Sequence, residues 1–95
     1  MTGAAPLSDP GRLRILYFAW LRERVGTAEE DVAFPPDVAT IGDLIAWLSS
    51  RGPGFAAAFA ATRTIRCAVN QTFTGFDAPV AAGDEVAFFP PVTGG

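Results

Sequence analysis

The sequence predicts an α+β fold, in which one mixed sheet of about five strands carries one main helix across one face. Two strand-like segments, residues 12–20 and 29–34, alternate between apolar and polar side chains. Residues 40–51 instead repeat apolar side chains at helical spacing. The strand pattern then returns in three shorter segments: residues 63–69, 72–74 and 85–89. Strands on both sides of one helix are typical of a sheet with that helix packed across it.

The first strand, residues 12–20, has two unlike faces. Alternation places an apolar set on one face: Leu13, Ile15, Tyr17 and Ala19. The opposite face begins with two arginines, Arg12 and Arg14, and is therefore expected to meet solvent. This solvated face also carries three large apolar side chains: Leu16, Phe18 and Trp20.

Residues 40–51 are predicted to form the main helix. Thr40 is its N-cap, and Asp43 three residues on is a weaker form of the Glu or Gln that completes a capping box. The apolar stripe of this helix consists of Ile41, Leu44, Ile45 and Leu48. Gly52-Pro53 ends the helix, and residues 55–61 are predicted to form a second, shorter one.

Short connections join the remaining elements. A helical or irregular segment, residues 21–25, links the first two strands. Asn70-Gln71 is predicted to form the turn between the third strand and its return at residues 72–74. Residues 75–82 then cross the surface to the last strand, which ends at a double proline.

Composition excludes several kinds of site. The chain has no His and one Cys, so it offers no metal site built from His and Cys, no internal disulfide and no Cys–His nucleophile pair. Cys67 alternates with Ile65 and Val69, and we expect a buried structural residue there. The net charge of −3, without a basic cluster, argues against nucleic-acid binding.

The apolar runs are all shorter than the roughly 20 residues of a membrane span. Residues 1–10 lack the basic start and apolar centre of a signal peptide. We therefore expect a cytoplasmic protein without membrane association. Its parts are expected to be a disordered leader at residues 1–11, one domain at residues 12–90 and an extended tail at residues 91–95.

The C-terminal stretch, residues 83–95, combines three features. A strand at residues 85–89 follows a Gly-Asp turn. Pro90-Pro91 then ends the strand, because proline has no N–H to donate, and continues the chain as a stiff spacer. The stretch closes on Gly94-Gly95, which has no Cβ and can enter a channel too narrow for other residues. This combination indicates that the terminal carboxylate is used.

The C-terminal stretch resembles the small sulfur-carrier subunits of molybdopterin synthase, which are ubiquitin-like β-grasp proteins. Shorter motifs share the resemblance: Phe18-Ala19, Leu21-Arg22-Glu23, Val25-Gly26 and Val69-Asn70-Gln71-Thr72. The resemblance covers residues 12–95, although residues 51–62 carry no matching motif. It implies a β-grasp in which the first and last strands are parallel neighbours at the centre of the sheet.

The resemblance also implies a chemistry for the tail. The C-terminal glycine of that family, here Gly95 after Gly94, is adenylated, converted to a thiocarboxylate and used to donate sulfur to a cyclic pterin precursor. The active-site pocket lies on the large subunit, so this chain is not expected to be an enzyme by itself. No cofactor is expected to bind it, and ATP is used by the activating enzyme. The residues expected to line the threading path are Pro90, Pro91, Val92 and Thr93.

Three partners are implied by the resemblance: the large subunit of the synthase, an adenylating enzyme of the ubiquitin-activating type, and a sulfur donor protein. Two carriers in each complex, as a heterotetramer, are implied as well.

The residues themselves point to a docking surface. Phe18, Phe73 and Phe89 are expected to share the open face of the sheet, rimmed by Arg14 and Arg66. The alternative is a scatter of tolerated surface aromatics.

Other functions stay open at this point. The same tail chemistry serves sulfur carriers of thiazole or cysteine synthesis, although the approach Phe-Phe-Pro-Pro-Val-Thr at residues 88–93 favours the molybdopterin branch. A ubiquitin-like modifier would instead pass its activated carboxylate to a lysine of another protein. An inert scaffold would not use its terminus, so deleting Gly95 would change nothing.

Overall fold

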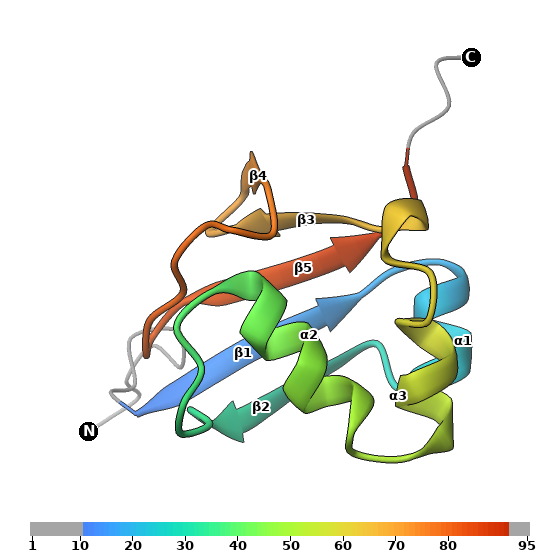
Figure 1. Cartoon of the computed structure of the whole chain (residues 1–95), viewed down its shortest axis with the longest axis horizontal. Coiled ribbons are helices and arrows are strands. Elements are labelled where there is room, and N and C mark those ends of the chain that lie inside the picture. Colours follow the sequence, from blue (N-terminus) through green and yellow to red (C-terminus); the bar gives the residue numbers. More distant parts are fainter. Residues whose placement is uncertain (1–10, 92–95) are drawn as a thin grey trace.

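The computed structural model describes residues 11–91. One mixed sheet has the strand order β2-β1-β5-β3-β4, and α2 crosses one of its faces (Figure 1). The strands are β1 (Arg12–Tyr17), β2 (Glu29–Ala33), β3 (Arg66–Val69), β4 (Thr72–Thr74) and β5 (Glu85–Phe89). The helices are α1 (Trp20–Val25), α2 (Ile41–Ser49), α3 (Pro53–Ala58) and the short 3-10 helix η2 (Thr62–Thr64). The α+β prediction, with its β-grasp arrangement, is confirmed.

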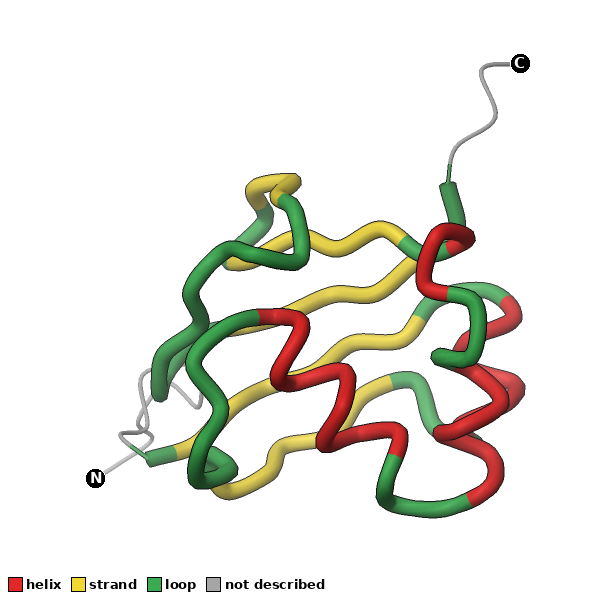
Figure 2. The backbone as a smooth tube through the Cα atoms, viewed as in Figure 1, coloured by secondary structure: helices red, strands yellow, loops and turns green. Residues whose placement is uncertain are grey.

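The first and last strands are neighbours at the centre of the sheet (Figure 2). β1 and β5 are parallel, with Ile15 opposite Val86 and Tyr17 opposite Phe88. β5 is also antiparallel to β3, so it is paired on both sides. The last strand is therefore held firmly, and the chain leaves the sheet from a central position.

The core lies between the sheet and the helices. The fully buried side chains are Leu13, Ile15, Tyr17, Leu21, Ile41, Leu44, Leu48, Ile65, Cys67, Val86 and Phe88. They include three of the four residues predicted for the apolar face of the first strand and most of the stripe predicted for α2. The fourth residue of that face, Ala19, is exposed, because the strand ends before it. Burial of apolar area on this scale is the main favourable contribution to folding.

The start of α2 is the capping box that the sequence predicts. Asp43 N donates to Thr40 Oγ1 at 3.2 Å, and Thr40 N donates to Asp43 Oδ2 at 3.2 Å. Ala39 N donates to the same carboxylate at 3.0 Å. These backbone donors lower the pKa of Asp43, because they stabilise the ionised carboxylate. The cap fixes where the helix begins over the sheet.

The predicted second strand is one residue too long, and two others are each too long by three residues. The first was expected to reach Trp20, but β1 ends at Tyr17 and Trp20 begins α1. Ala19 breaks the strand with φ 56 and ψ −133, and Leu21 N closes the turn on Phe18 O at 3.2 Å. This turn, without Gly or Pro, carries no clear sequence signal.

The third strand was expected from residue 63, but β3 begins at Arg66. The preceding threonines form η2, in which both the hydroxyl and the N–H of Thr64 donate to Ala61 O, at 2.6 and 2.9 Å. A threonine that bonds its local backbone competes with strand pairing. The shorter second helix expected at residues 55–61 is present as α3, which both starts earlier, at Pro53, and ends earlier, at Ala58.

The ends of the chain fall outside this description. The expected leader lies almost entirely in residues 1–10, and Val92, Thr93, Gly94 and Gly95 lie beyond residue 91. Within residues 11–91, the structure has no helix long and apolar enough to cross a membrane.

Candidate functional site

The tail leaves the domain directly from the central strand. Val86 and Phe88 of β5 point into the core and are fully buried, whereas Phe89 lies on the opposite, open face of the sheet. Pro90 and Pro91 continue from this strand at the end of the sheet where α1 lies (Figure 1). A partner that binds Pro90 and Pro91 therefore lies next to this end of the sheet.

A hollow of about 480 Å³ opens on the face of the sheet opposite α2, next to the tail. We call it the aromatic hollow. Its lining residues are Phe18, Ala68, Gln71, Phe73, Ala87, Phe89 and Pro90. Phe73 is 77% exposed and Phe18 is 47% exposed, which is unusual for phenylalanine. Exposed aromatic side chains gathered around one hollow are typical of a protein-binding surface.

Strand register explains how the aromatic hollow forms. Ala68 of β3 lies opposite Ala87 of β5 on one side and opposite Phe73 of β4 on the other. The two alanines make a low floor, and the ring of Phe73 stands beside that of Phe89 with centroids 5.3 Å apart and planes tilted by 41°. Small side chains between large ones thus create a concave rather than a flat surface.

The turn between β3 and β4 positions Phe73 over this floor. Asn70 and Gln71 both have a left-handed backbone, with φ 51 and 72. Asn70 Nδ2 donates to Asp84 Oδ1 at 3.0 Å, and Asn70 Oδ1 accepts from Glu85 N at 3.0 Å. This side chain therefore ties the turn to the start of β5, the strand that leads to the tail.

The acidic pair before β5 has a structural role. Asp84 Oδ2 accepts from Ala81 N at 2.9 Å, while Oδ1 accepts from Asn70. These contacts agree with the Gly-Asp turn that the sequence predicts before the last strand. No group of three or more His, Cys, Asp or Glu side chains that could hold a metal ion occurs within residues 11–91.

The single cysteine is buried, as predicted. Cys67 is 1% exposed, and its Sγ donates to Thr74 O at 3.4 Å. Burial raises the pKa of this thiol, because it disfavours the thiolate. A protonated, enclosed thiol is a poor nucleophile, so Cys67 fits a core position rather than a sulfur-transfer role.

The structure brings most of the predicted docking residues together. Phe18, Phe73, Phe89 and Pro90 line one hollow, and their role in partner binding stays a prediction. Arg14 and Arg66, predicted as its rim, do not line it: Arg14 pairs with Glu29 at 3.6 Å, and Arg66 donates to the backbone carbonyls just before β3. The sequence analysis did not predict three of the lining residues: Ala68, Gln71 and Ala87. Their contribution depends on strand register, which the sequence pattern alone does not give.

Comparison with known proteins identifies the family. The model of the ThiS family matches residues 15–95. The chain belongs to the ThiS family. The molybdopterin synthase sulfur carrier subunit of Escherichia coli (strain K12) is 43% identical over 83 residues, which cover 87% of this chain and 99% of that protein.

Solved structures of similar proteins share the fold of this ThiS-family chain. A putative molybdopterin converting factor, subunit 1, from Pyrococcus furiosus has a TM-score of 0.67 and 28% identity, over 85% of this chain and 98% of that one. SAMP1 from Haloferax volcanii has a TM-score of 0.66 and 31% identity, over 90% of this chain and 100% of that one. The similarity extends over nearly the whole domain in both.

Proposed function

We propose that this protein is the sulfur carrier subunit of molybdopterin synthase. The carboxylate of Gly95 is adenylated by a partner enzyme, converted to a thiocarboxylate and used to donate sulfur to the cyclic pterin precursor of the molybdenum cofactor. The protein delivers the sulfur, and the pocket in which the pterin reacts belongs to the large subunit. The observation that carries this proposal is 43% identity, over most of the chain, to a curated sulfur carrier subunit.

The proposed chemistry needs activation because a carboxylate is a poor electrophile. ATP, bound by the activating enzyme, converts it to an acyl-adenylate with release of pyrophosphate. A persulfide-type sulfur donor then attacks the carbonyl carbon, a C–S bond forms and AMP leaves. Reductive cleavage of the donor's S–S bond by a thiol leaves the thiocarboxylate on Gly95. In this scheme Gly94 and Gly95 are the residues at the reacting end.

The domain supports this chemistry by holding the tail in place. β5 is paired on both sides, so the start of the tail is fixed at the centre of the sheet. Pro90 and Pro91 restrict the backbone that follows, and Val92 and Thr93 are proposed to line the path to the reacting end. The aromatic hollow lies beside this path, and we assign it to docking on the large subunit.

A mass measurement tests the proposed function. The purified protein is incubated with the activating enzyme, ATP and a sulfur donor. Its intact mass should increase by one sulfur-for-oxygen exchange, located at Gly95 by fragmentation. The product should then convert the pterin precursor when the large subunit is added. A variant that lacks Gly95 is the control and should remain unchanged. An unchanged mass for the wild-type protein would refute the proposal.

A ubiquitin-like modifier is the second candidate. It is favoured by the structural similarity to SAMP1, a small archaeal modifier protein. A modifier forms amide conjugates with lysines of other proteins. This chain contains no lysine, so another copy of it offers no lysine for conjugation. The incubation above separates the two functions when a cell extract is added. High-mass conjugates that need Gly95 favour the modifier, and a thiocarboxylate without conjugates favours the carrier.

A further inference from the structure

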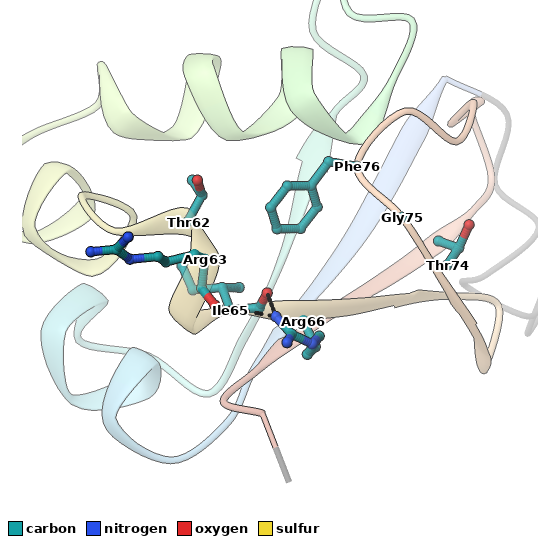
Figure 3. Close-up of a pocket in the computed structure, with 7 residues that line it drawn as sticks. All are labelled: Thr62, Arg63, Ile65, Arg66, Thr74, Gly75 and Phe76. Carbon is teal, nitrogen blue, oxygen red and sulfur yellow. Dashed lines mark hydrogen bonds between the residues drawn. The ribbon is translucent and has the colours of Figure 1, made fainter. Parts of the chain in front are cut away.

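A second hollow, of about 370 Å³, lies where β3 begins, between η2 and the segment that follows β4. We call it the arginine hollow. Its lining residues are Thr62, Arg63, Ile65, Arg66, Thr74, Gly75 and Phe76 (Figure 3). Ile65 is buried and Phe76 is half-buried, so part of the surface is apolar. The lining contains two arginines and two threonine hydroxyls but no acidic residue.

The two arginines of this hollow differ from three others in the chain. Arg12, Arg14 and Arg51 each lie within 3.6 Å of a carboxylate oxygen of β2. Arg63 and Arg66 are exposed, and neither is within ion-pair distance of a carboxylate in residues 11–91. The arginine hollow therefore has positive charge that the described part of the chain does not neutralise.

The arrangement of the side chains indicates what the arginine hollow binds. Arg63 and Arg66 leave the chain on either side of Ile65 and point away from each other (Figure 3). Arg66 Nη1 is held by the carbonyl oxygens of Ile65 at 3.1 Å and Arg63 at 3.3 Å. Two separated guanidinium groups with an apolar surface between them suit an acidic polypeptide segment better than one small anion.

The arginine hollow is also close to the site already described. Arg66 lies opposite Phe89 in the register of β3 and β5, and Phe89 lines the aromatic hollow next to the tail. A protein that covers the aromatic hollow and takes the tail thus extends onto Arg66. The acidic residues Asp84 and Glu85 stand at the other end of β5, about 13 Å away along the strand.

We propose that the arginine hollow binds an acidic segment of the large subunit of molybdopterin synthase. An apolar side chain of that segment packs on the half-buried ring of Phe76, and flanking carboxylates pair with Arg63 and Arg66. This inference rests on the proposed function, since it names the surface chemistry of the partner that receives the tail. The contact makes docking depend on complementary charge, on a surface that is otherwise apolar, and so favours a partner with acidic residues at this position.

The test measures binding of the full-length variants to the large subunit by surface plasmon resonance. Arg66→Gln and the double variant Arg63→Gln/Arg66→Gln are compared with Arg12→Gln, which removes the same charge from the far end of β1. We expect the double variant to weaken binding about three- to thirtyfold in low salt, as for two exposed ion pairs. The difference should shrink at 1 M salt, where charges are screened. Arg12→Gln should bind as the wild type does.

Two further measurements make the result decisive. The affinity of Phe89→Asp for the large subunit is measured in parallel. If Phe89→Asp and the double arginine variant both bind as the wild type does, docking through the aromatic hollow is wrong. If only Phe89→Asp loses affinity, only the arginine inference is refuted. Inorganic phosphate is titrated into the free protein and followed by NMR. Saturable shifts at Arg63 and Arg66, combined with unchanged affinity of the double variant for the large subunit, would mean a small-anion site and overturn the proposal. Circular dichroism checks that each variant is folded.

Discussion

The hydroxyl of Tyr17 donates a hydrogen bond of 2.6 Å to Oε2 of Glu30, from the centre of the core to the edge strand β2. Arg51 Nη1 lies 2.9 Å from the same oxygen, and its guanidinium carbon lies 4.6 Å from the ring centroid of Phe55 in α3. The network joins β1 and β2 to α3 and to the turn between α2 and α3, where Arg51 lies. Burial raises the pKa of Tyr17, and the hydrogen bond to the Glu30 carboxylate raises it further.

This raised pKa predicts a loss of stability in alkali. The folded protein keeps the Tyr17 proton, whereas the unfolded chain loses it near pH 10. The unfolded state therefore binds fewer protons, and the free energy of unfolding decreases as the pH rises above about 10. The chain has one tyrosine, so tyrosinate absorbance reports this group alone. We expect the absorbance to appear together with the loss of circular dichroism.

The control for this prediction is Tyr17→Phe. This substitution should cost about 1.5–3 kcal/mol at neutral pH, the value of a hydrogen bond to a charged group. Its stability should fall less steeply above pH 10. Cys67, whose pKa burial also raises, contributes a decrease of the same sign in both proteins, so the comparison isolates Tyr17. Tyrosinate absorbance near pH 10 with unchanged circular dichroism would contradict the prediction.

Two Gly→Ala substitutions should have opposite effects. A Cβ on Gly54 would overlap Arg24 O, where α3 meets α1, so Gly54→Ala must push the helices apart. We expect a loss of about 1–3 kcal/mol, as for other overpacked sites. A Cβ on Gly42 of α2 meets its nearest atom at an ordinary 3.6 Å. Gly42→Ala should therefore gain up to about 1 kcal/mol from helix propensity. Urea denaturation measures both, and equal effects would rule out this explanation.

The turn between β3 and β4 makes a second matched pair. Gln71 has φ 72 and makes no side-chain hydrogen bond within residues 11–91, so Gln71→Gly should stabilise the protein by about 0.5 kcal/mol through relief of backbone strain. Asn70→Gly gives the same relief but removes the contacts to Asp84 and Glu85. We expect it to cost about 1–2 kcal/mol. Thermal unfolding distinguishes the two, and a stabilised Asn70→Gly protein would show that these contacts contribute little.

Parts of this fold could be predicted because their signals are local. β5 has the predicted bounds, since a Gly-Asp turn precedes it and Pro90 ends it. α2 begins after Thr40, as the capping box requires. The early end of β1 could not be predicted in this way, because Ala19 has a positive φ without the glycine that usually marks one.

The candidate site was predictable only in part. Alternation placed Phe18 and Phe89 on the open face, because the period of a strand is two residues. The floor of the aromatic hollow depends on Ala68 lying opposite Ala87, and that register is set by contacts between distant segments. The arginine hollow depends on η2, where a threonine-bonded turn replaces the expected strand.

The exposed ring of Phe73 predicts a binding effect without a stability effect. Phe73 is 77% exposed, so Phe73→Ala removes little buried area and should change the free energy of unfolding by less than about 0.5 kcal/mol. Its ring lies 5.3 Å from that of Phe89 on the proposed docking surface. Affinity for the large subunit should fall about thirtyfold, as for an aromatic hot spot. Phe59→Ala is the control, because this core ring is 3% exposed and its loss should destabilise the fold. Calorimetric titration that gave wild-type affinity for Phe73→Ala would place the docking surface elsewhere on the domain.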